Sequence, residues 1–245
     1  MTINIAVIPA RSGSKGIKNK NLVKVHGKSL VERSYEHAKN SKIFKKIIVS
    51  TDSLKIAQQI NPQITADIFE KNLNNFITVD GITLVHNRDS IMAQDLSPIR
   101  ELLFMISNKF EFSNLWMLQP TSPFRFNYEF NEIIRIIHNS EFSNLNWSSV
   151  VSCRVLSEVH PDRMLQIRNS YAFPIIESLL GDNTPRQSLE QVYIKDGAYY
   201  VLRKENLIND IMLGECIVPY LRSGYSTINI DTFDDLIKAR KVKEK

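Results

Sequence analysis

The chain has 245 residues, of which 43% are hydrophobic, and this is enough for one substantial core in a single main domain. The net charge of +5 is modest and gathers near the start of the chain, which argues against a nucleic-acid-binding surface. The cysteines Cys153 and Cys216 fit neither a disulfide framework nor a metal site, so we expect a reducing cytoplasm, with no signal leader and no membrane span.

The first predicted element is a buried strand over residues 5–9, which leads into a basic loop spaced by glycines. Gly13 and Gly16 allow the backbone to turn tightly, so that its N–H groups can converge on an anion. No acidic residue occurs before Glu32. The positive charges of the loop come from four residues: Arg11, Lys15, Lys18 and Lys20. The pattern favours a phosphate-binding loop over a mobile basic surface loop.

A helix and a second strand follow the basic loop. Ser29 and Glu32 have the spacing of a capping box, which predicts a helix to about Ser41. Residues 46–50 are continuously apolar and β-branched, as in a strand buried on both faces, and Asp52 is expected to cap the next helix. The alternation of strands and helices predicts an α/β fold, in which a mostly parallel three-layer sheet carries helices on both faces.

The middle and end of the chain give further elements. Around Asp80-Gly81 we consider a hairpin or a loop before one strand, and we favour the loop. The other predicted elements are helices over 97–109 and 128–138 and strands over 115–118, 150–153, 192–194 and 198–201. Residues 156–191 contain short extended pieces and no long helix, and we interpret them as an arm. Residues 228–231 are predicted to form a last strand, followed by a helix capped by Thr232 and Asp235.

Polar clusters follow several of the predicted strands. Residues 11–21, 51–52 and 119–125 each come after a strand, and so does Asp231. In open α/β sheets, ligands bind beyond the carboxyl ends of the strands. We therefore expect one crevice that contains all of these residues.

Six motifs in this order resemble the cytidylyltransferases that make CMP-sialic acids. They are residues 8–16 with Lys20-Asn21, Val49–Asp52, Leu118–Arg125, Pro185–Gln187, Asp196–Tyr199 and Ile230-Asp231. Each motif is weak by itself, but together they cover nearly the whole chain. The resemblance implies a single domain of the nucleotide-diphospho-sugar transferase type and a homodimer whose arm enters the partner's site.

The resemblance also implies a reaction and a set of residues. The anomeric hydroxyl of a nine-carbon 2-keto sugar acid would attack the α-phosphate of CTP and release pyrophosphate, with Mg²⁺ as cofactor. Catalytic roles are implied for Arg11, Lys20 and Asp231. Nucleotide contacts are implied for Ala10, Arg11, Ser14, Lys15, Lys20, Asn21 and Arg88. Sugar contacts are implied for Gln119, Arg125, Arg163 and Arg186, and metal contacts for Asp231 and Asn229.

The chain departs from the family pattern at two positions. Asn229 stands where relatives carry a second aspartate, and a carboxamide can offer an oxygen to a metal but cannot act as a base. Ile194 stands where sialic-acid enzymes often have arginine, which favours a modified nonulosonic acid such as a legionaminic- or pseudaminic-type sugar. Two alternatives stay open: a Kdo-type synthetase and a catalytically impaired, nucleotide-binding homologue that serves as a partner subunit.

Overall fold

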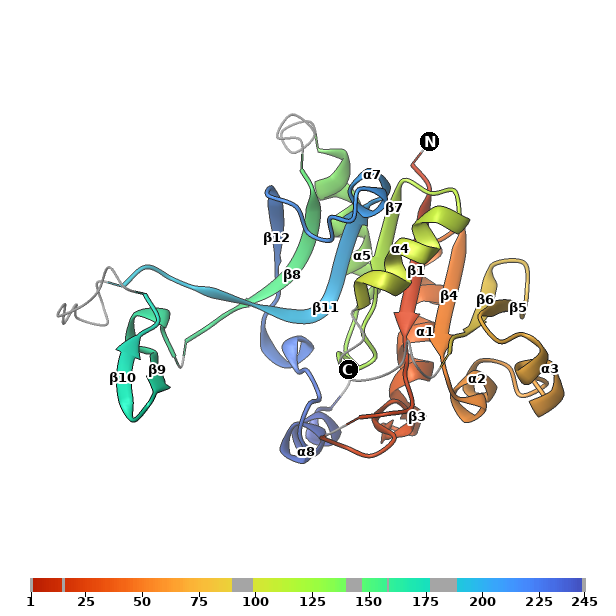
Figure 1. The fold of residues 1–245 in the computed structure, drawn as a ribbon, viewed down its shortest axis with the longest axis horizontal. Helices are drawn as coiled ribbons and strands as arrows, with labels where there is room; N and C mark the ends of the chain where they lie inside the picture. Colours follow the sequence, from red (N-terminus) through yellow and green to blue (C-terminus); the bar gives the residue numbers. More distant parts are fainter. Residues whose placement is uncertain are drawn as a thin grey trace.

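The computed structural model describes residues 2–14, 16–89, 99–139, 147–157, 159–176 and 189–243. Within these ranges, eight strands form one sheet (Figure 1). In chain order they are β1 (Asn4–Pro9), β4 (Lys46–Thr51), β5 (Asn75–Thr78), β6 (Thr83–Asn87), β7 (Asn114–Met117), β8 (Ser149–Val155), β11 (Tyr193–Arg203) and β12 (Ile217–Leu221). Two small antiparallel pairs lie outside this sheet: β2 (Lys24–Val25) with β3 (Lys28–Ser29), and β9 (Leu165–Arg168) with β10 (Tyr171–Pro174).

The sheet has the strand order β12-β8-β11-β7-β1-β4-β6-β5. Strand β1 lies in the middle and runs parallel to β4 and β7, and β4 runs parallel to β6. β12 is parallel to β8, whereas β11 is antiparallel to both β7 and β8. Because β1, β4, β6 and β7 point the same way, their carboxyl ends meet at one edge. The expected mostly parallel α/β fold is confirmed.

Helices cover both faces of the sheet. α1 (Leu30–Ser41), α2 (Leu54–Ile60) and α5 (Asn127–His138) pack on one face, and α4 (Ile99–Lys109) and α7 (Lys204–Ile208) pack on the other. Side chains of β1 alternate between the two layers: Ala6 and Ile8 join the first core, and Ile5 and Val7 the second. The short α3 (Ala66–Lys71) follows α2, and α8 (Phe233–Lys241) closes the described chain. Both predicted capping boxes, at α1 and α8, are present.

Several sequence expectations need correction. β5 and β6 pair antiparallel, so the turn around Asp80-Gly81 joins a hairpin rather than leading into one strand. Residues 228–231 do not form a strand, and the sequence did not predict the edge strand β12. The two strands expected over 192–201 are one strand, β11, with an irregularity between Lys195 and Tyr200. The expected helix start at Ser97-Pro98 lies outside the described residues.

An arm projects from one side of the sheet between β8 and β11. The two strands continue beyond the sheet and carry the β9–β10 hairpin away from the body of the molecule (Figure 1). The hairpin is short, and its β9 residues are all exposed. None of the described helices is long and apolar enough to span a membrane.

Candidate active site

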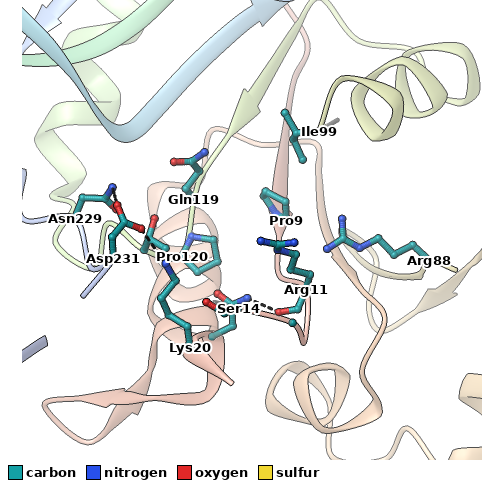
Figure 2. Close-up of a pocket in the computed structure, with 13 residues that line it drawn as sticks. Pro9, Arg11, Ser14, Lys20, Arg88, Ile99, Gln119, Pro120, Asn229 and Asp231 are labelled. Atoms are coloured by element: carbon teal, nitrogen blue, oxygen red, sulfur yellow. Dashed lines mark hydrogen bonds and ion pairs between the residues drawn. The ribbon is translucent and has the colours of Figure 1, made fainter. Parts of the chain in front are cut away.

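A cavity of about 410 Å³ opens where β1 and β7 end (Figure 2). Pro9 ends β1, and Gln119-Pro-Thr121 follow β7 at the cavity wall. Eight of the residues implied by the sequence line this one cavity: Arg11, Ser14, Lys20, Asn21, Arg88, Gln119, Asn229 and Asp231. In Figure 2, Asp231 and Arg88 lie on opposite sides of the cavity with Arg11 between them.

The basic loop after β1 is fixed by side chains from outside it. The carboxylate of Asp52 accepts hydrogen bonds from the backbone N–H of Ser12 at 2.7 Å and from its hydroxyl at 2.6 Å. The amide of Asn21 donates to the carbonyl of Arg11 at 2.7 Å. Asp52 is therefore a clamp on the basic loop, and not the helix cap that the sequence suggests, since Ser53 is the N-cap of α2. These hydrogen bonds hold the backbone of the loop at Arg11 and Ser12.

The loop that carries Asp231 meets the basic loop directly. The ammonium group of Lys20 lies 2.9 Å from Oδ1 of Asp231, and the amide nitrogen of Asn229 donates to Oδ2 at 3.0 Å (Figure 2). Gly16 packs so closely against the backbone of Asp231 that an added Cβ would lie 2.3 Å from its carbonyl oxygen. Residues that are 211 positions apart in the chain thus form one wall of the cavity.

Arg88 follows β6 and is 5% exposed. Its Nε is buried and has no hydrogen-bond partner within the part of the chain that the structure describes. Burial lowers the pKa of this guanidinium, the charge of Asp52 opposes that shift, and the charge of Arg11 adds to it. A buried donor without a partner costs free energy, so Arg88 is poised to donate to a bound ligand.

Gln119 lines the cavity, but Arg125 does not. The guanidinium of Arg125 is buried under the loop that it belongs to, where it donates to the carbonyls of Gln119 and Ser122 at 2.7 Å each. It also donates to the carbonyl of Ala198 at 3.0 Å and to the hydroxyl of Ser34 at 3.1 Å. We therefore correct the sugar-contact role implied for Arg125: it supports the loop from beneath.

The remaining implied residues lie elsewhere. Ala10 is buried at the end of β1, donates its N–H to Ser50 and does not line the cavity. Arg163 is exposed in the short helix η3 (Pro161–Arg163) of the arm, and it does not line the cavity. Lys15 and Arg186 lie outside the described residues. Sequence reasoning also missed a buried cluster beneath the cavity floor, formed by Glu129 and Arg222 with Asp196.

Oxygen donors for a metal are few in the cavity. Among the described residues, no group of three or more histidine, cysteine or acidic side chains could hold a metal ion. Asp231 offers a carboxylate, and the buried Oδ1 of Asn229 has no hydrogen-bond partner in the described part of the chain. Mg²⁺ prefers oxygen ligands and is commonly bound by one or two carboxylates together with substrate phosphates. The donor set fits a metal that is held jointly by the protein and a polyphosphate.

Comparisons with known proteins find cytidylyltransferases among the proteins that this chain resembles. The family model described as cytidylyltransferase matches residues 5–74. The chain is 29% identical to a CMP-N,N'-diacetyllegionaminic acid synthase from Legionella pneumophila, over 98% of this chain and 96% of that protein. It is 25% identical to an N-acylneuraminate cytidylyltransferase from Escherichia coli, over 98% of this chain and 52% of that protein, so it spans about half the length of that enzyme.

Among solved structures, the chain resembles a CMP:2-keto-3-deoxy-manno-octonic acid synthetase complexed with CTP. The TM-score is 0.64 and the sequence identity 17%, over 98% of this chain and 97% of that one. At this identity the likeness concerns the fold alone. The two sequence relatives, in contrast, are 25% and 29% identical to this chain over 98% of its length.

Proposed function

We propose that this chain, which belongs to the cytidylyltransferases related to N-acylneuraminate and CMP-legionaminic acid enzymes, transfers a cytidylyl group from CTP to a nine-carbon 2-keto-3-deoxy sugar acid. The products would be the CMP-sugar and pyrophosphate. The observation that carries the proposal is the approach of Lys20 to Asp231, at 2.9 Å, in a cavity that also contains Arg11 and Arg88.

The basic loop is suited to hold the triphosphate. Arg11 and Lys20 bring positive charge to the cavity, and Ser14 adds a hydroxyl. Phosphoryl transfer relies mainly on positioning and on neutralising the charge of the transferred and leaving groups. Arg88, with its buried donor, lies across the cavity from Asp231 and would contact the cytidine portion (Figure 2). These residues would align the α-phosphate with the anomeric hydroxyl of the acceptor.

Asp231 would hold Mg²⁺, with the amide oxygen of Asn229 as a neutral second donor. When bound, the metal supplies a Lewis acid that neutralises charge on the phosphate oxygens and orients them. Asn229 donates its N–H to Oδ2 of Asp231 and so holds that carboxylate in one orientation. The site would thus work with a single carboxylate, and the proton of the attacking hydroxyl would have to leave to Asp231 or to solvent.

The assay that tests this function measures pyrophosphate release. Purified protein is incubated with CTP and Mg²⁺ and with N-acetylneuraminic acid, N,N'-diacetyllegionaminic acid, a pseudaminic-type acid or 3-deoxy-manno-octulosonic acid in turn. We expect release with a nine-carbon acid, and release only with the octulosonic acid would instead establish the Kdo-type alternative. CTP binding without release for any sugar would favour the impaired homologue, which the amide at Asn229 motivates.

We also propose that the arm joins two copies of the chain. Ile167 on β9 and Tyr171 on β10 are 76% and 72% exposed, and Leu165 is 60% exposed, which is unusual for apolar side chains on a short two-stranded hairpin. A two-stranded hairpin of this size is only marginally stable by itself and becomes more stable when it packs on another surface. In a dimer, Arg163 would reach the partner's cavity, as the resemblance implies.

Ile167→Glu tests this arrangement. A charge in the centre of the apolar hairpin would have to be desolvated on dimerisation, so we expect the variant to sediment as a monomer where the parent sediments as a dimer. Ile68→Glu, at an exposed position on α3 far from the arm, is the matched control and is expected to leave the assembly unchanged. A parent protein that is monomeric at all concentrations tested would refute the dimer.

The location in the cell stays a prediction as well. We propose a reducing cytoplasm because the sequence spacing of Cys153 and Cys216 fits neither a disulfide framework nor a metal site.

A further inference from the structure

Four charged side chains are buried together behind the loop whose residues Gln119–Thr121 line the cavity. Arg125, Glu129, Asp196 and Arg222 are each between 2% and 6% exposed. Arg222 lies at the centre: its Nε donates to Glu129 at 2.7 Å and its Nη1 donates to Asp196 at 2.9 Å. The hydroxyl of Tyr199 donates to Glu129 at 2.8 Å. Two positive and two negative charges therefore balance in a place that water does not reach.

The two arginines bind the backbone of the segment 119–125, whose first three residues line the cavity. Arg125 donates to the carbonyls of Gln119 and Ser122, and Arg222 donates through Nη2 to the carbonyl of Phe124 at 2.5 Å. In the opposite direction, the hydroxyl of Ser122 donates to the carbonyl of Asp196 at 3.2 Å. The carbonyl of Pro123 accepts from a third buried arginine, Arg33, at 3.1 Å. Four carbonyls of this short segment are thus held by buried guanidinium groups.

The same cluster reaches the side chain of Gln119. Asp196 precedes Gly197, whose φ of +81° is one that glycine adopts at little cost. A Cβ at Gly197 would lie 2.8 Å from Oε1 of Gln119, so the Gln119 amide packs directly on the backbone of this turn. Asp196 holds the turn in two ways, because it accepts from Arg222 and from the N–H of Ala198 at 3.0 Å.

Stability alone is a weak reason for such a cluster. Replacing a buried ion pair by well-packed apolar groups is often neutral or stabilising, because desolvation of the charges offsets their attraction. A network of charge-assisted hydrogen bonds does, however, fix geometry, since each partner has a preferred direction. Both Arg125 and Arg222 donate to backbone carbonyls of the segment 119–125, and a role in positioning that segment would explain why the charges are kept.

We propose that Arg222, through its ion pairs with Glu129 and Asp196, is a positioning residue that sets the placement of Gln119 for the sugar acid. This inference rests on the proposed function. Arg222 would not touch the substrates, and its effect would pass through the backbone of 119–125 and the turn at Gly197. The acceptor side of the cavity would depend on it, while the basic loop, which is held separately by Asp52 and Asn21, would not.

Arg222→Lys is the first test, since lysine keeps the charge but cannot reach three acceptors in the fixed fork of a guanidinium. We expect the KM for the best sugar acid of the panel to rise about tenfold, because a small misplacement of a positioning group is costly, with the KM for CTP changing much less. Ser122→Ala, which removes one hydrogen bond between the loop and Asp196, should shift the same KM in the same direction by a smaller factor.

The control is Asn4→Ala, at the opposite end of β1. Oδ1 of Asn4 is buried and accepts from Asn114 at 3.2 Å and from the indole of Trp116 at 3.1 Å, so its loss destabilises the sheet without touching 119–125. We expect Asn4→Ala to lower the thermal midpoint and leave both KM values unchanged. The proposal would be overturned if Arg222→Lys and Ser122→Ala raised the KM for CTP as much as the KM for the sugar acid. It would also be overturned if neither variant changed the KM for the sugar acid.

A second readout is independent of the acceptor. Amide hydrogen exchange is measured on the parent, Arg222→Lys, Ser122→Ala and Asn4→Ala proteins. We expect faster exchange in the peptide that contains 119–125 for the first two variants and not for Asn4→Ala. If no sugar acid in the panel is turned over, the proposed function fails, but exchange still decides the positioning role: unchanged protection of 119–125 in both cluster variants would refute it.

Discussion

A methyl group added at Gly16 would collide with the backbone that carries Asp231, and we predict that Gly16→Ala lowers turnover while the protein stays folded. The added Cβ would lie 2.3 Å from the carbonyl oxygen of Asp231, whereas ordinary contact begins at 3.4 Å. Relief of the overlap separates the basic loop from Asp231 by about 1 Å. A misplacement of about 1 Å can cost about 10²-fold in rate, which corresponds to about 2.7 kcal/mol of transition-state stabilisation.

The assay compares kcat/KM for pyrophosphate release with the thermal midpoint of each protein. Gly16 is exposed, and the collision concerns two surface loops, so the midpoint should change little. Gly81→Ala is the control, because a Cβ at Gly81 meets nothing within 4 Å and the residue lies in the β5–β6 turn, outside the cavity lining. If Gly16→Ala is as active as Gly81→Ala, the contact between the two loops does not set the geometry of the site.

Three other substitutions test separate parts of the molecule. Lys20→Met should raise the KM for CTP strongly by removing a cation from the cavity, and an unchanged KM would mean that the loop does not hold the triphosphate. Asp231→Ala should abolish Mg²⁺-dependent turnover with the fold intact, and near-parental activity would exclude this residue from the mechanism. Burial lowers the pKa of His86 from 6.5 to about 4 in the folded protein. As the pH falls, this histidine is therefore protonated in the unfolded chain before it is protonated in the folded one, and the free energy of unfolding should decrease progressively between pH 6.5 and about 4. His86→Asn should flatten that drop in urea unfolding measured across this range, and an identical pH dependence would refute it.

Much of the site could be predicted because it follows from local sequence and from one topological rule. Gly13, Gly16 and the lysines of the basic loop lie close together in the chain, and their charge and backbone freedom are visible without a structure. The rule that carboxyl ends of parallel strands meet at one edge then brings Arg88 and Gln119 to the same cavity. For Asp231 the topological argument was wrong, because the strand expected over 228–231 does not form, although Asp231 does line the cavity.

The parts that sequence reasoning missed depend on contacts between distant residues. Glu129 and Arg222 are 93 positions apart, and nothing in the sequence around either one indicates an ion pair. Arg125 is a cationic residue in the same loop as the cavity residue Gln119, and this suggests a contact with a ligand. In the structure, however, its guanidinium points into the protein and donates to the carbonyl of Gln119. The clamp of Asp52 on the basic loop was missed for a similar reason, because an acidic residue before a helix is usually a cap.

The Lys20–Asp231 pair constrains how substrates can enter the site. Lys20 is the cation proposed for the triphosphate and Asp231 the carboxylate proposed for the metal, and the two form an ion pair at 2.9 Å. The side chain of Lys20 is 14% exposed and that of Asp231 is 63% exposed, so loss of the pair would leave the lysine as the less hydrated, uncompensated charge. A metal ion that bound Asp231 without a nucleotide would leave Lys20 in this uncompensated state. A nucleotide that binds together with its metal ion offers a phosphate to Lys20 and a cation to Asp231 at the same time. We therefore expect the nucleotide and the metal ion to bind as one complex.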